Sequence, residues 1–223
     1  MQEEENLPKI KLPNYIAIEG PIGVGKTSLA KKIAKEYGYD LCLEKPDENP
    51  FLGSFYNDQQ KYAFSTQMYF VMQRSQQINQ FFSEDLLKRN IISDFIFQKE
   101  SLFAEVNLSN EELKIFEEVK SKFYEKYPKP DLLIYLQASP KRIFDQVKMR
   151  GKEYEEKINL EYLEKICSAY SEFFFSYSES PLLVLNVDDV DFVSNQMDFN
   201  QIIDCVKKSI IGREFINLSP SFF

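Results

Sequence analysis

Short apolar runs alternate with longer amphipathic stretches along this chain. The apolar runs predict β-strands at 15–18, 41–43, 90–92, 132–136 and 182–187. Helical spacing of apolar positions predicts α-helices at 65–82, 109–126, 140–149, 160–177 and 200–210. Alternation of strand and helix implies crossover connections, which make neighbouring strands parallel. The pattern therefore predicts an α/β fold, a doubly wound five-stranded parallel sheet with flanking helices.

The sequence contains no linker rich in proline, glycine or serine. We therefore expect a single domain that spans residues 1–223. Its acidic start, residues 1–13, is expected to be a flexible N-terminus. Residues 212–223 have no clear periodicity, so we expect a C-terminal tail there.

The most specific motif lies between the first expected strand and an amphipathic helix expected at 28–34. It runs from Gly20 to Thr27 as a glycine, four residues and then Gly-Lys-Thr. Such a P-loop turns backbone N–H groups towards phosphate oxygens, while its lysine reaches the β- and γ-phosphates and its threonine ligates Mg²⁺. We therefore expect a P-loop NTPase that binds a nucleoside triphosphate with Mg²⁺. The residues expected to hold the triphosphate are Gly20, Gly23, Val24, Gly25, Lys26, Thr27 and Ser28.

Acidic residues follow the first three expected strands: Glu19, Glu44 and Asp94. Ligands of a doubly wound sheet lie beyond the carboxyl ends of its strands, so Glu44 and Asp94 would flank the γ-phosphate. One carboxylate could take the proton of an attacking hydroxyl while another holds Mg²⁺, directly or through water. The chain has no histidine, so a general base must be a carboxylate, a lysine or a tyrosine. Either acid is also typical of a helix N-cap or a turn.

Two polar residues of the helical stretch 65–82 suit a nucleobase. Gln67 and Arg74 are seven residues apart and share a helix face with Phe70 and Val71. The Gln67 amide offers both a donor and an acceptor to the edge of a base. Because the same helix carries several more glutamines, a solvated face remains an open interpretation.

Three cations surround Gly151 at the end of the helical stretch 140–149, namely Lys148, Arg150 and Lys152. In a lid they would close over the triphosphate, stabilise the transferring phosphoryl group and exclude water. The same residues are typical of an ordinary helix C-terminus, with glycine just past the end and basic residues in the last turn. The pattern leaves both interpretations open.

Charge and composition narrow the partners. A net charge of −8 disfavours general nucleic-acid binding, which needs clustered lysine and arginine. Residues 1–5 are unlike the basic start of a signal peptide, and no apolar run approaches the length of a membrane span. We expect a cytoplasmic protein with no nucleic-acid or membrane partner. Its widely spaced cysteines favour reduced thiols over disulfides; they are Cys42, Cys167 and Cys205.

Taken in order, the motifs resemble the deoxynucleoside kinases over roughly residues 14–193, in particular the bacterial deoxyadenosine/deoxyguanosine kinase branch. That branch shares the run from Ser93 to Lys99 in similar form. The segments that carry the resemblance are Gly20–Thr27, Glu44 with Pro46, Asn49–Leu52, Phe55–Tyr56, Gln67–Arg74, Ser93–Phe95, Arg150–Lys152 and Tyr162–Leu163. Several spaced motifs in order are much more specific than a P-loop alone.

The resemblance implies an ATP-dependent kinase that phosphorylates the 5′-hydroxyl of a 2′-deoxynucleoside, with purine deoxynucleosides as the expected acceptors, for nucleotide salvage. The expected catalytic residues are then Glu44 as the general base, Lys26 and Arg150. Thr27 and Asp94 are the expected Mg²⁺ ligands. The residues expected around the nucleoside are Glu44, Tyr56, Gln67, Arg74, Asp94, Lys99, Glu100 and Glu155.

Two roles rest on the resemblance alone. Tyr56 and Glu155 would hold the 3′-hydroxyl, and Asp191 with Phe192 would contact the adenine of ATP, beside the lid cations Arg150 and Lys152. The resemblance also favours a homodimer. The helical stretches 65–82 and 109–126 are rich in Phe, Tyr and Met, which core packing explains equally well.

Three positions depart from the family's pattern. Phe95 stands where many members carry an arginine, and we hypothesise that Lys99 supplies the missing charge. Glu100 stands where relatives often place a base-contacting aspartate. Gln146 stands where some relatives carry a lid arginine, and Lys148 is the candidate substitute for it.

Two other functions stay open. A nucleoside monophosphate kinase of the thymidylate kinase type shares the sheet, the P-loop and the lid, but its acceptor calls for arginines where this chain has Glu44 and Phe95. A non-catalytic ATP-binding module is kept open by Phe95. A GTPase is disfavoured, because the sequence lacks the Asn-Lys-x-Asp guanine motif.

Overall fold

The computed structural model describes residues 12–81, 89–124 and 127–221. The flexible N-terminus expected at 1–13 therefore lies outside the described residues except for Leu12 and Pro13, and Leu12 is buried in the core. The last residue of the helix expected at 65–82 lies outside them too, as do the last two of the helix expected at 109–126.

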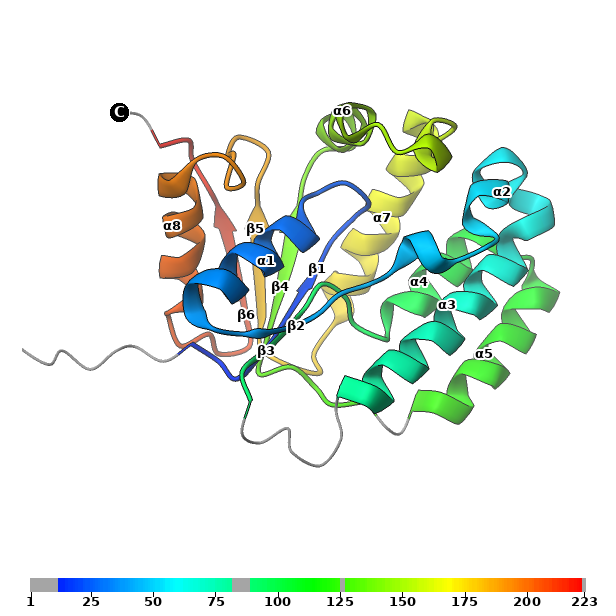
Figure 1. Cartoon of the computed structure of the whole chain (residues 1–223), viewed down its shortest axis with the longest axis horizontal. Coiled ribbons are helices and arrows are strands. Elements are labelled where there is room, and N and C mark those ends of the chain that lie inside the picture. The colour runs from blue at the N-terminus through cyan, green and yellow to red at the C-terminus, as the bar shows by residue number, and fades with distance from the viewer. Residues whose placement is uncertain (1–11, 82–88, 125–126, 222–223) are drawn as a thin grey trace, which may run out of the picture.

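Six strands form one sheet in which neighbouring strands run parallel (Figure 1). Their order across the sheet is β2-β3-β1-β4-β5-β6. The strands are β1 (Tyr15–Glu19), β2 (Asp40–Cys42), β3 (Ile91–Ser93), β4 (Leu132–Gln137), β5 (Leu182–Asn186) and β6 (Arg213–Asn217). The chain builds strands first on one side of β1 and then on the other, which confirms the doubly wound α/β fold.

The expectation of five strands was wrong, because β6 adds a sixth at the edge of the sheet. It occupies part of the stretch expected to be a C-terminal tail and pairs with β5 from Leu182–Arg213 to Asn186–Asn217. All five residues of β6 are half-buried or exposed. An edge strand with one neighbour needs no continuous apolar run, so the hydrophobic pattern did not reveal it.

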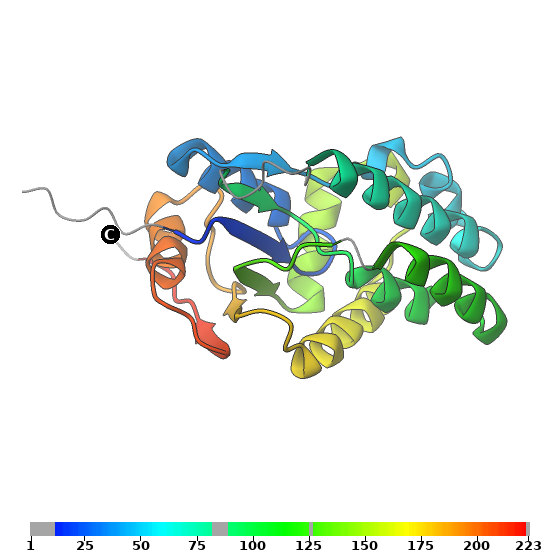
Figure 2. The ribbon, with the colours of Figure 1, turned by 90° about the horizontal axis from the view of Figure 1, so that it is seen from below.

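Helices cover both faces of the sheet, with α1 and α8 on one face and α3, α4, α5 and α7 on the other (Figure 2). The helices are α1 (Lys26–Tyr37), α2 (Leu52–Asn57), α3 (Gln59–Phe81), α4 (Lys99–Asn107), α5 (Asn110–Tyr124), α6 (Pro140–Arg150), α7 (Leu160–Ser176) and α8 (Gln196–Val206). The sequence pattern missed α2 and α4, which are too short to repeat the helical spacing of apolar residues several times. α8 begins at Gln196 rather than at residue 200, because the Asn195 side chain caps its first backbone N–H groups.

The central strands form a rigid platform for the chemistry. Ile16, Leu133 and Leu183 are fully buried, because β1, β4 and β5 are covered on both faces, which explains their continuous apolar runs. Each such side chain contributes about 1.5–3 kcal/mol of burial free energy. The loop after β1, the helix α6 and the turn that follows α6 lie beyond the carboxyl ends of the strands (Figure 1). In the described part of the chain, no helix is long and apolar enough to cross a membrane.

Candidate active site

The P-loop between β1 and α1 wraps around the amine of Lys26. Lys26 Nζ donates hydrogen bonds to the carbonyl oxygens of Gly20 and Pro21, at 2.7 Å and 3.0 Å. Burial, followed by the charge of Lys99, lowers the pKa of Lys26 to about 8. Gly25 has φ +104° and lies against the Phe192 ring, where an added Cβ would approach to 2.7 Å. The loop therefore needs glycine there for its conformation and for space.

Asp94, at the end of β3, ties the P-loop to the end of β2. Its carboxylate accepts a hydrogen bond from the Thr27 hydroxyl and another, at 2.7 Å, from the backbone N–H of Glu44. A hydroxyl and a carboxylate side by side are hard oxygen ligands of the kind that Mg²⁺ prefers. The described residues contain no cluster of three or more His, Cys, Asp or Glu side chains that could hold a metal by themselves. The site thus fits an ion that keeps several waters and phosphate oxygens as ligands.

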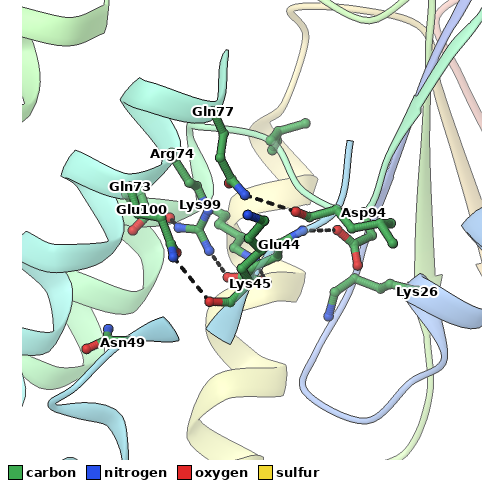
Figure 3. A network of polar contacts seen from close by, with 12 residues as sticks. Lys26, Glu44, Lys45, Asn49, Gln73, Arg74, Gln77, Asp94, Lys99 and Glu100 are labelled. Carbon is green, nitrogen blue, oxygen red and sulfur yellow. Dashed lines mark hydrogen bonds and ion pairs between the residues drawn. The ribbon is translucent and has the colours of Figure 1, made fainter. Parts of the chain in front are cut away.

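Glu44 is held by two cations (Figure 3). Its Oε1 accepts a hydrogen bond from Arg74 Nη2, and its Oε2 accepts one from Lys99 Nζ at 2.9 Å. Arg74 and Lys99 are almost fully buried, and burial lowers their pKa values, to about 10 for Arg74 and about 8 for Lys99. For Lys99, the charge of Arg74 lowers the pKa further. We call these three side chains the Glu44 clamp.

Arg74 extends the clamp to a second carboxylate, since its Nη1 pairs with Glu100 Oε1. The rings of Phe70 and Phe95 lie 5.1 Å and 5.5 Å from the guanidinium carbon, so two aromatic faces flank the cation. One guanidinium therefore joins Glu44 to Glu100 inside an aromatic setting.

The polar face of α3 points inward. Gln67 and Arg74 are each 2% exposed, so the interpretation of this face as solvated was wrong for both. Gln73 donates to the Lys45 carbonyl and Gln77 to the Leu43 carbonyl, so two further glutamines of α3 fix the segment that carries Glu44. The Gln67 carbonyl oxygen is buried without a hydrogen-bond partner among the described residues. That oxygen can accept from a ligand.

The turn after α6 bears the expected lid residues. α6 ends at Arg150, and Gly151 adopts φ +65° while its N–H bonds the Val147 carbonyl, so the helix-end interpretation is confirmed. Arg150 also pairs with Glu155, through Nε–Oε2 at 3.0 Å and Nη2–Oε1 at 2.5 Å. Lys152 binds Asp47, and Lys148 Nζ donates to the Glu156 carbonyl.

One cavity gathers most of the expected site. Of the expected residues it is lined by Lys26, Thr27, Glu44, Tyr56, Gln67, Arg74, Asp94, Lys99, Glu100, Arg150, Lys152 and Glu155. Burial raises the pKa of Tyr56 well above its ordinary value, so its hydroxyl stays neutral and can donate a hydrogen bond. Sequence reasoning missed Phe103, Tyr154 and Tyr170 in the aromatic wall of this cavity, and it noticed Phe55 and Tyr162 only as parts of motifs.

A second, more open groove lies on the other side of the P-loop. Its lining includes Gly23, Gly25, Lys26, Thr27, Ser28, Arg142, Gln146, Arg150 and Asp191. Asp191 Oδ1 accepts from the N–H groups of Val193 and Ser194, whereas Phe192 is buried against Gly25 and does not line the groove. Lys148 lines neither cavity.

Two cations that sequence reasoning missed hold the loop around Asp191. Arg142 donates from Nη1 to the Asp188 carbonyl and from Nη2 to the Val190 carbonyl, the latter at 2.5 Å. Lys32 Nζ donates to the Phe192 carbonyl at 3.1 Å. Neither residue belongs to a sequence motif, so only their spatial position reveals this function.

Glu19 forms a further buried link behind the P-loop. Its carboxylate accepts hydrogen bonds from the Gly20 N–H, from the Ile96 N–H at 2.7 Å and from the Tyr170 hydroxyl at 3.0 Å. Its Oε1 also lies 4.0 Å from Lys99 Nζ. Glu19 thus connects the P-loop, the loop after β3 and α7.

Comparison with known proteins gives a consistent result. Residues 16–211 match the family model described as deoxynucleoside kinase. The chain is 34% identical over 203 residues to the deoxyguanosine kinase of Bacillus subtilis. This match covers 88% of this chain and 98% of that relative. It is 30% identical over 217 residues to the deoxyadenosine kinase of Lactobacillus acidophilus, a match that covers 91% of this chain and 98% of that relative. Among solved structures it is similar to deoxyadenosine kinase from M. mycoides with bound dATP, with TM-score 0.75, 26% identity, and 87% of this chain and 100% of that chain covered.

Proposed function

This chain belongs to the deoxynucleoside kinase family, and from that premise we propose which deoxynucleoside it takes and which residues carry out the reaction. The protein is an ATP-dependent kinase of the 5′-hydroxyl of 2′-deoxynucleosides. The acceptor that we propose is a purine deoxynucleoside, which is supported by the names of relatives that span nearly the whole chain. The inner cavity binds the nucleoside and the open groove binds ATP.

The observation that carries the proposal is the position of Glu44 in the lining of the inner cavity, together with the P-loop residues Lys26 and Thr27. Its backbone is bonded to Asp94 beside the P-loop, while its carboxylate is bonded to Arg74 beside Glu100. A base in that position can reach a 5′-hydroxyl that faces the γ-phosphate.

In the reaction, a Glu44 carboxylate oxygen takes the proton of the 5′-hydroxyl. The hydroxyl oxygen forms a bond to the γ-phosphorus, the bond between that phosphorus and the β–γ bridging oxygen breaks, and ADP leaves with the bond's electron pair. Lys26 and Arg150, which line both cavities, stabilise the charge that develops on the phosphoryl oxygens. Thr27 and Asp94 would hold Mg²⁺, which neutralises charge on the β- and γ-phosphates when it is bound.

Lys99 supplies the positive charge that many family members have in an arginine at the position of Phe95. The support is its hydrogen bond to Glu44 and its buried position beside Glu19. When Glu44 takes the proton, the ammonium of Lys99 still has the Glu19 carboxylate within reach. The clamp thus positions the base before the substrate arrives.

The sugar and the base are held by the remaining residues of the inner cavity. Gln67 reads the base with its unpartnered carbonyl oxygen, and Glu100, fixed by Arg74, reads it from the other side. Tyr56 and Glu155 hold the 3′-hydroxyl. In the groove, Asp191 lies beside the adenine, and Phe192 acts from behind by supporting Gly25.

The deciding experiment is an acceptor panel with ATP and Mg²⁺. The four natural deoxynucleosides and their 5′-monophosphates are offered to the wild-type protein, with Lys26→Met as the control for dependence on the P-loop. We expect 5′-monophosphates from deoxyadenosine or deoxyguanosine and no turnover in the control. Turnover only on monophosphates would favour a thymidylate kinase type of reaction, and ATP binding without turnover would favour a non-catalytic module.

We also propose a homodimer that contacts through α3 and α5. Met72 on α3 and Ile115 on α5 are 52% and 54% exposed, and α3 packs against α5, so a second copy that contacts this helix pair would cover apolar surface. Sedimentation of the wild-type protein beside a Met72→Lys/Ile115→Lys variant tests the assembly.

A cytoplasmic location and a single domain over 1–223 stay predictions.

A further inference from the structure

A cluster of three side chains joins the turn after α6 to the segment after β2. Asp47 lies in the 3₁₀ turn Pro46–Glu48. Its carboxylate accepts hydrogen bonds from Lys152 Nζ at 2.8 Å and 3.1 Å, and from the Tyr154 hydroxyl at 2.7 Å. Lys152 Nζ also donates to the Tyr154 hydroxyl at 2.8 Å. The cluster therefore bridges segments that are 105 residues apart in the sequence.

The cluster lies at the rim of the inner cavity. Lys152 and Tyr154 line that cavity, as does Pro46, whereas Asp47 does not. The ring of Tyr154 is nearly parallel to that of Tyr56, with centroids 6.4 Å apart. Asp47 therefore contacts two lining residues of the cavity without lining it itself.

The rest of the turn makes its hydrogen bonds and ion pairs within itself, and its contact with α2 is one of packing. Arg150 pairs with Glu155, and Lys148 donates to the Glu156 carbonyl. These bonds fix the shape of the segment 148–156 but do not hold it down over the cavity. Within the described residues, the polar bonds that fasten the lining residues Lys152 and Tyr154 to another part of the chain are those to Asp47.

We propose that Asp47 is a latch, a positioning residue that holds Lys152 and Tyr154 closed over the inner cavity and slows the release of the bound deoxynucleoside. The inference rests on the proposed assignment of this cavity to the nucleoside. The side chains of Asp47 and Lys152 are 68% and 31% exposed, so their ion pair is weak and readily broken. A weak pair suits a lid that opens in every catalytic cycle.

The test is isotope trapping with Asp47→Ala and Asp47→Asn. Protein loaded with the radiolabelled deoxynucleoside of highest turnover is mixed with ATP, Mg²⁺ and excess unlabelled nucleoside, and trapped monophosphate is measured. For Asp47→Ala we expect the deoxynucleoside to be released about three- to tenfold faster, because the variant loses one exposed ion pair and one hydrogen bond from a hydroxyl. The KM of the nucleoside should rise by the same factor, and the single-turnover rate at saturation should stay unchanged. Asp47→Asn keeps an acceptor for Tyr154 and should lie in between.

Glu161→Gln is the matched control, because Glu161 is an exposed carboxylate with a lysine partner at 2.8 Å, on α7. We expect release and KM to be unchanged in this variant. Tyr154→Phe keeps the ring and removes the hydroxyl, so its effect should shrink when Asp47→Ala is already present. A melting temperature for each variant separates a latch from a purely structural residue, which would lower the melting temperature and leave release unchanged.

Unchanged release in Asp47→Ala would overturn the latch. A lower KM for ATP with unchanged nucleoside release would overturn it as well, because Asp47 would then only compete with phosphate for Lys152. Failure of the proposed function is seen separately, since a wild-type protein that phosphorylates no deoxynucleoside in steady-state turnover has no nucleoside site for a latch to cover.

Discussion

The Glu44 clamp and the Asp47 latch both pair cations with carboxylates, but they differ in burial. In the clamp, the side chains of Arg74 and Lys99 are 2% and 5% exposed. In the latch, those of Lys152 and Asp47 are 31% and 68% exposed. Removing one partner of a buried pair costs about 3–5 kcal/mol, whereas an exposed pair contributes about 0–1 kcal/mol. The same chemistry therefore gives a fixed clamp inside and a reversible contact at the rim.

This difference matches two needs of phosphoryl transfer. The base must be in position before the substrate arrives, since positioning supplies much of the rate. The cover must open for each substrate and product. Burial, rather than residue type, decides which need an ion pair serves.

The largest expected effect comes from Arg74→Met, which removes the shared partner of Glu44 and Glu100. The buried Glu100 then loses its cation while Glu44 keeps Lys99, so we expect the free energy of unfolding to fall by about 3–5 kcal/mol. Urea unfolding measures it. Arg74→Lys is the matched control. Its free energy of unfolding should fall less, because an ammonium can still pair with one of the two carboxylates, although it cannot bridge both as the guanidinium does. A wild-type unfolding free energy in Arg74→Met would refute the fixed clamp.

A somewhat smaller effect is expected from Gly25→Ala in the P-loop. The new Cβ would meet the Phe192 ring at 2.7 Å on a backbone with φ +104°. The resulting strain, about 1–3 kcal/mol, should appear as weaker ATP binding in titration calorimetry. Phe192→Leu, combined with Gly25→Ala, should recover only the part due to the ring. Full recovery would mean that the backbone conformation carries no strain.

The buried lysine of the clamp should impose a pH limit on activity. The pKa of Lys99 is about 8, so its ammonium is lost as pH rises through 8. At saturating ATP, whose phosphates stabilise the charged form of Lys26, we expect kcat/KM for the deoxynucleoside to fall about tenfold per pH unit above that value. Lys99→Arg should move this fall to higher pH, because arginine keeps its charge. An identical profile in Lys99→Arg would remove Lys99 from the account.

The contribution of Lys99 to the free energy of unfolding should rise with pH, whereas activity should fall with pH. The folded-state pKa of about 8 lies below the ordinary 10.5 of lysine. Between these values the unfolded chain binds more protons than the folded one, so the contribution of Lys99 to the free energy of unfolding rises with pH. Unfolding in urea at pH 7.5 and 9.5 should show a smaller rise in Lys99→Met than in the wild type. An equal rise in both would contradict the assignment.

The smallest expected effect is that of salt, which should separate the two regions directly. Raising ionic strength from about 0.1 M to 1 M shortens the screening length from about 10 Å to 3 Å. The KM of the nucleoside should then rise about two- to threefold in the wild type, towards that of Asp47→Asn. The difference in unfolding free energy between wild type and Arg74→Met should stay the same. If salt raises the KM of Asp47→Asn as much as that of the wild type, the salt effect does not come from the ion pair of Asp47 and Lys152.

Strands with buried faces were predictable from the sequence, and strands or helices at the margin were not. β1, β4 and β5 are continuous apolar runs because both of their faces are covered. β6 has one neighbour and half-exposed residues, and α4 has nine residues. Neither element carries enough periodic positions to be distinguished from a loop.

The residue types of the candidate site were predictable, but the pairs between them were not. The P-loop, Glu44, Asp94, Gln67 and Arg74 follow from motif, strand order or helix spacing. Lys99 meets Glu44 across 55 residues and Arg74 meets it across 30, so these contacts depend on how α3 and α4 pack against β2. The latch at Asp47 has no motif at all and becomes visible only when the turn after α6 is seen beside it.

The central claim is that the clamped Glu44 carboxylate takes the proton of the 5′-hydroxyl. The most direct test is the single-turnover rate of phosphoryl transfer in Glu44→Gln, by rapid quench at saturating substrates. Glu161→Gln, at an exposed glutamate on α7, is the control, and calorimetry measures both substrate affinities. The account predicts a rate about 10²- to 10⁴-fold below wild type in Glu44→Gln, with both substrates still bound and the control unchanged. A Glu44→Gln rate close to wild type, with binding intact, would contradict it.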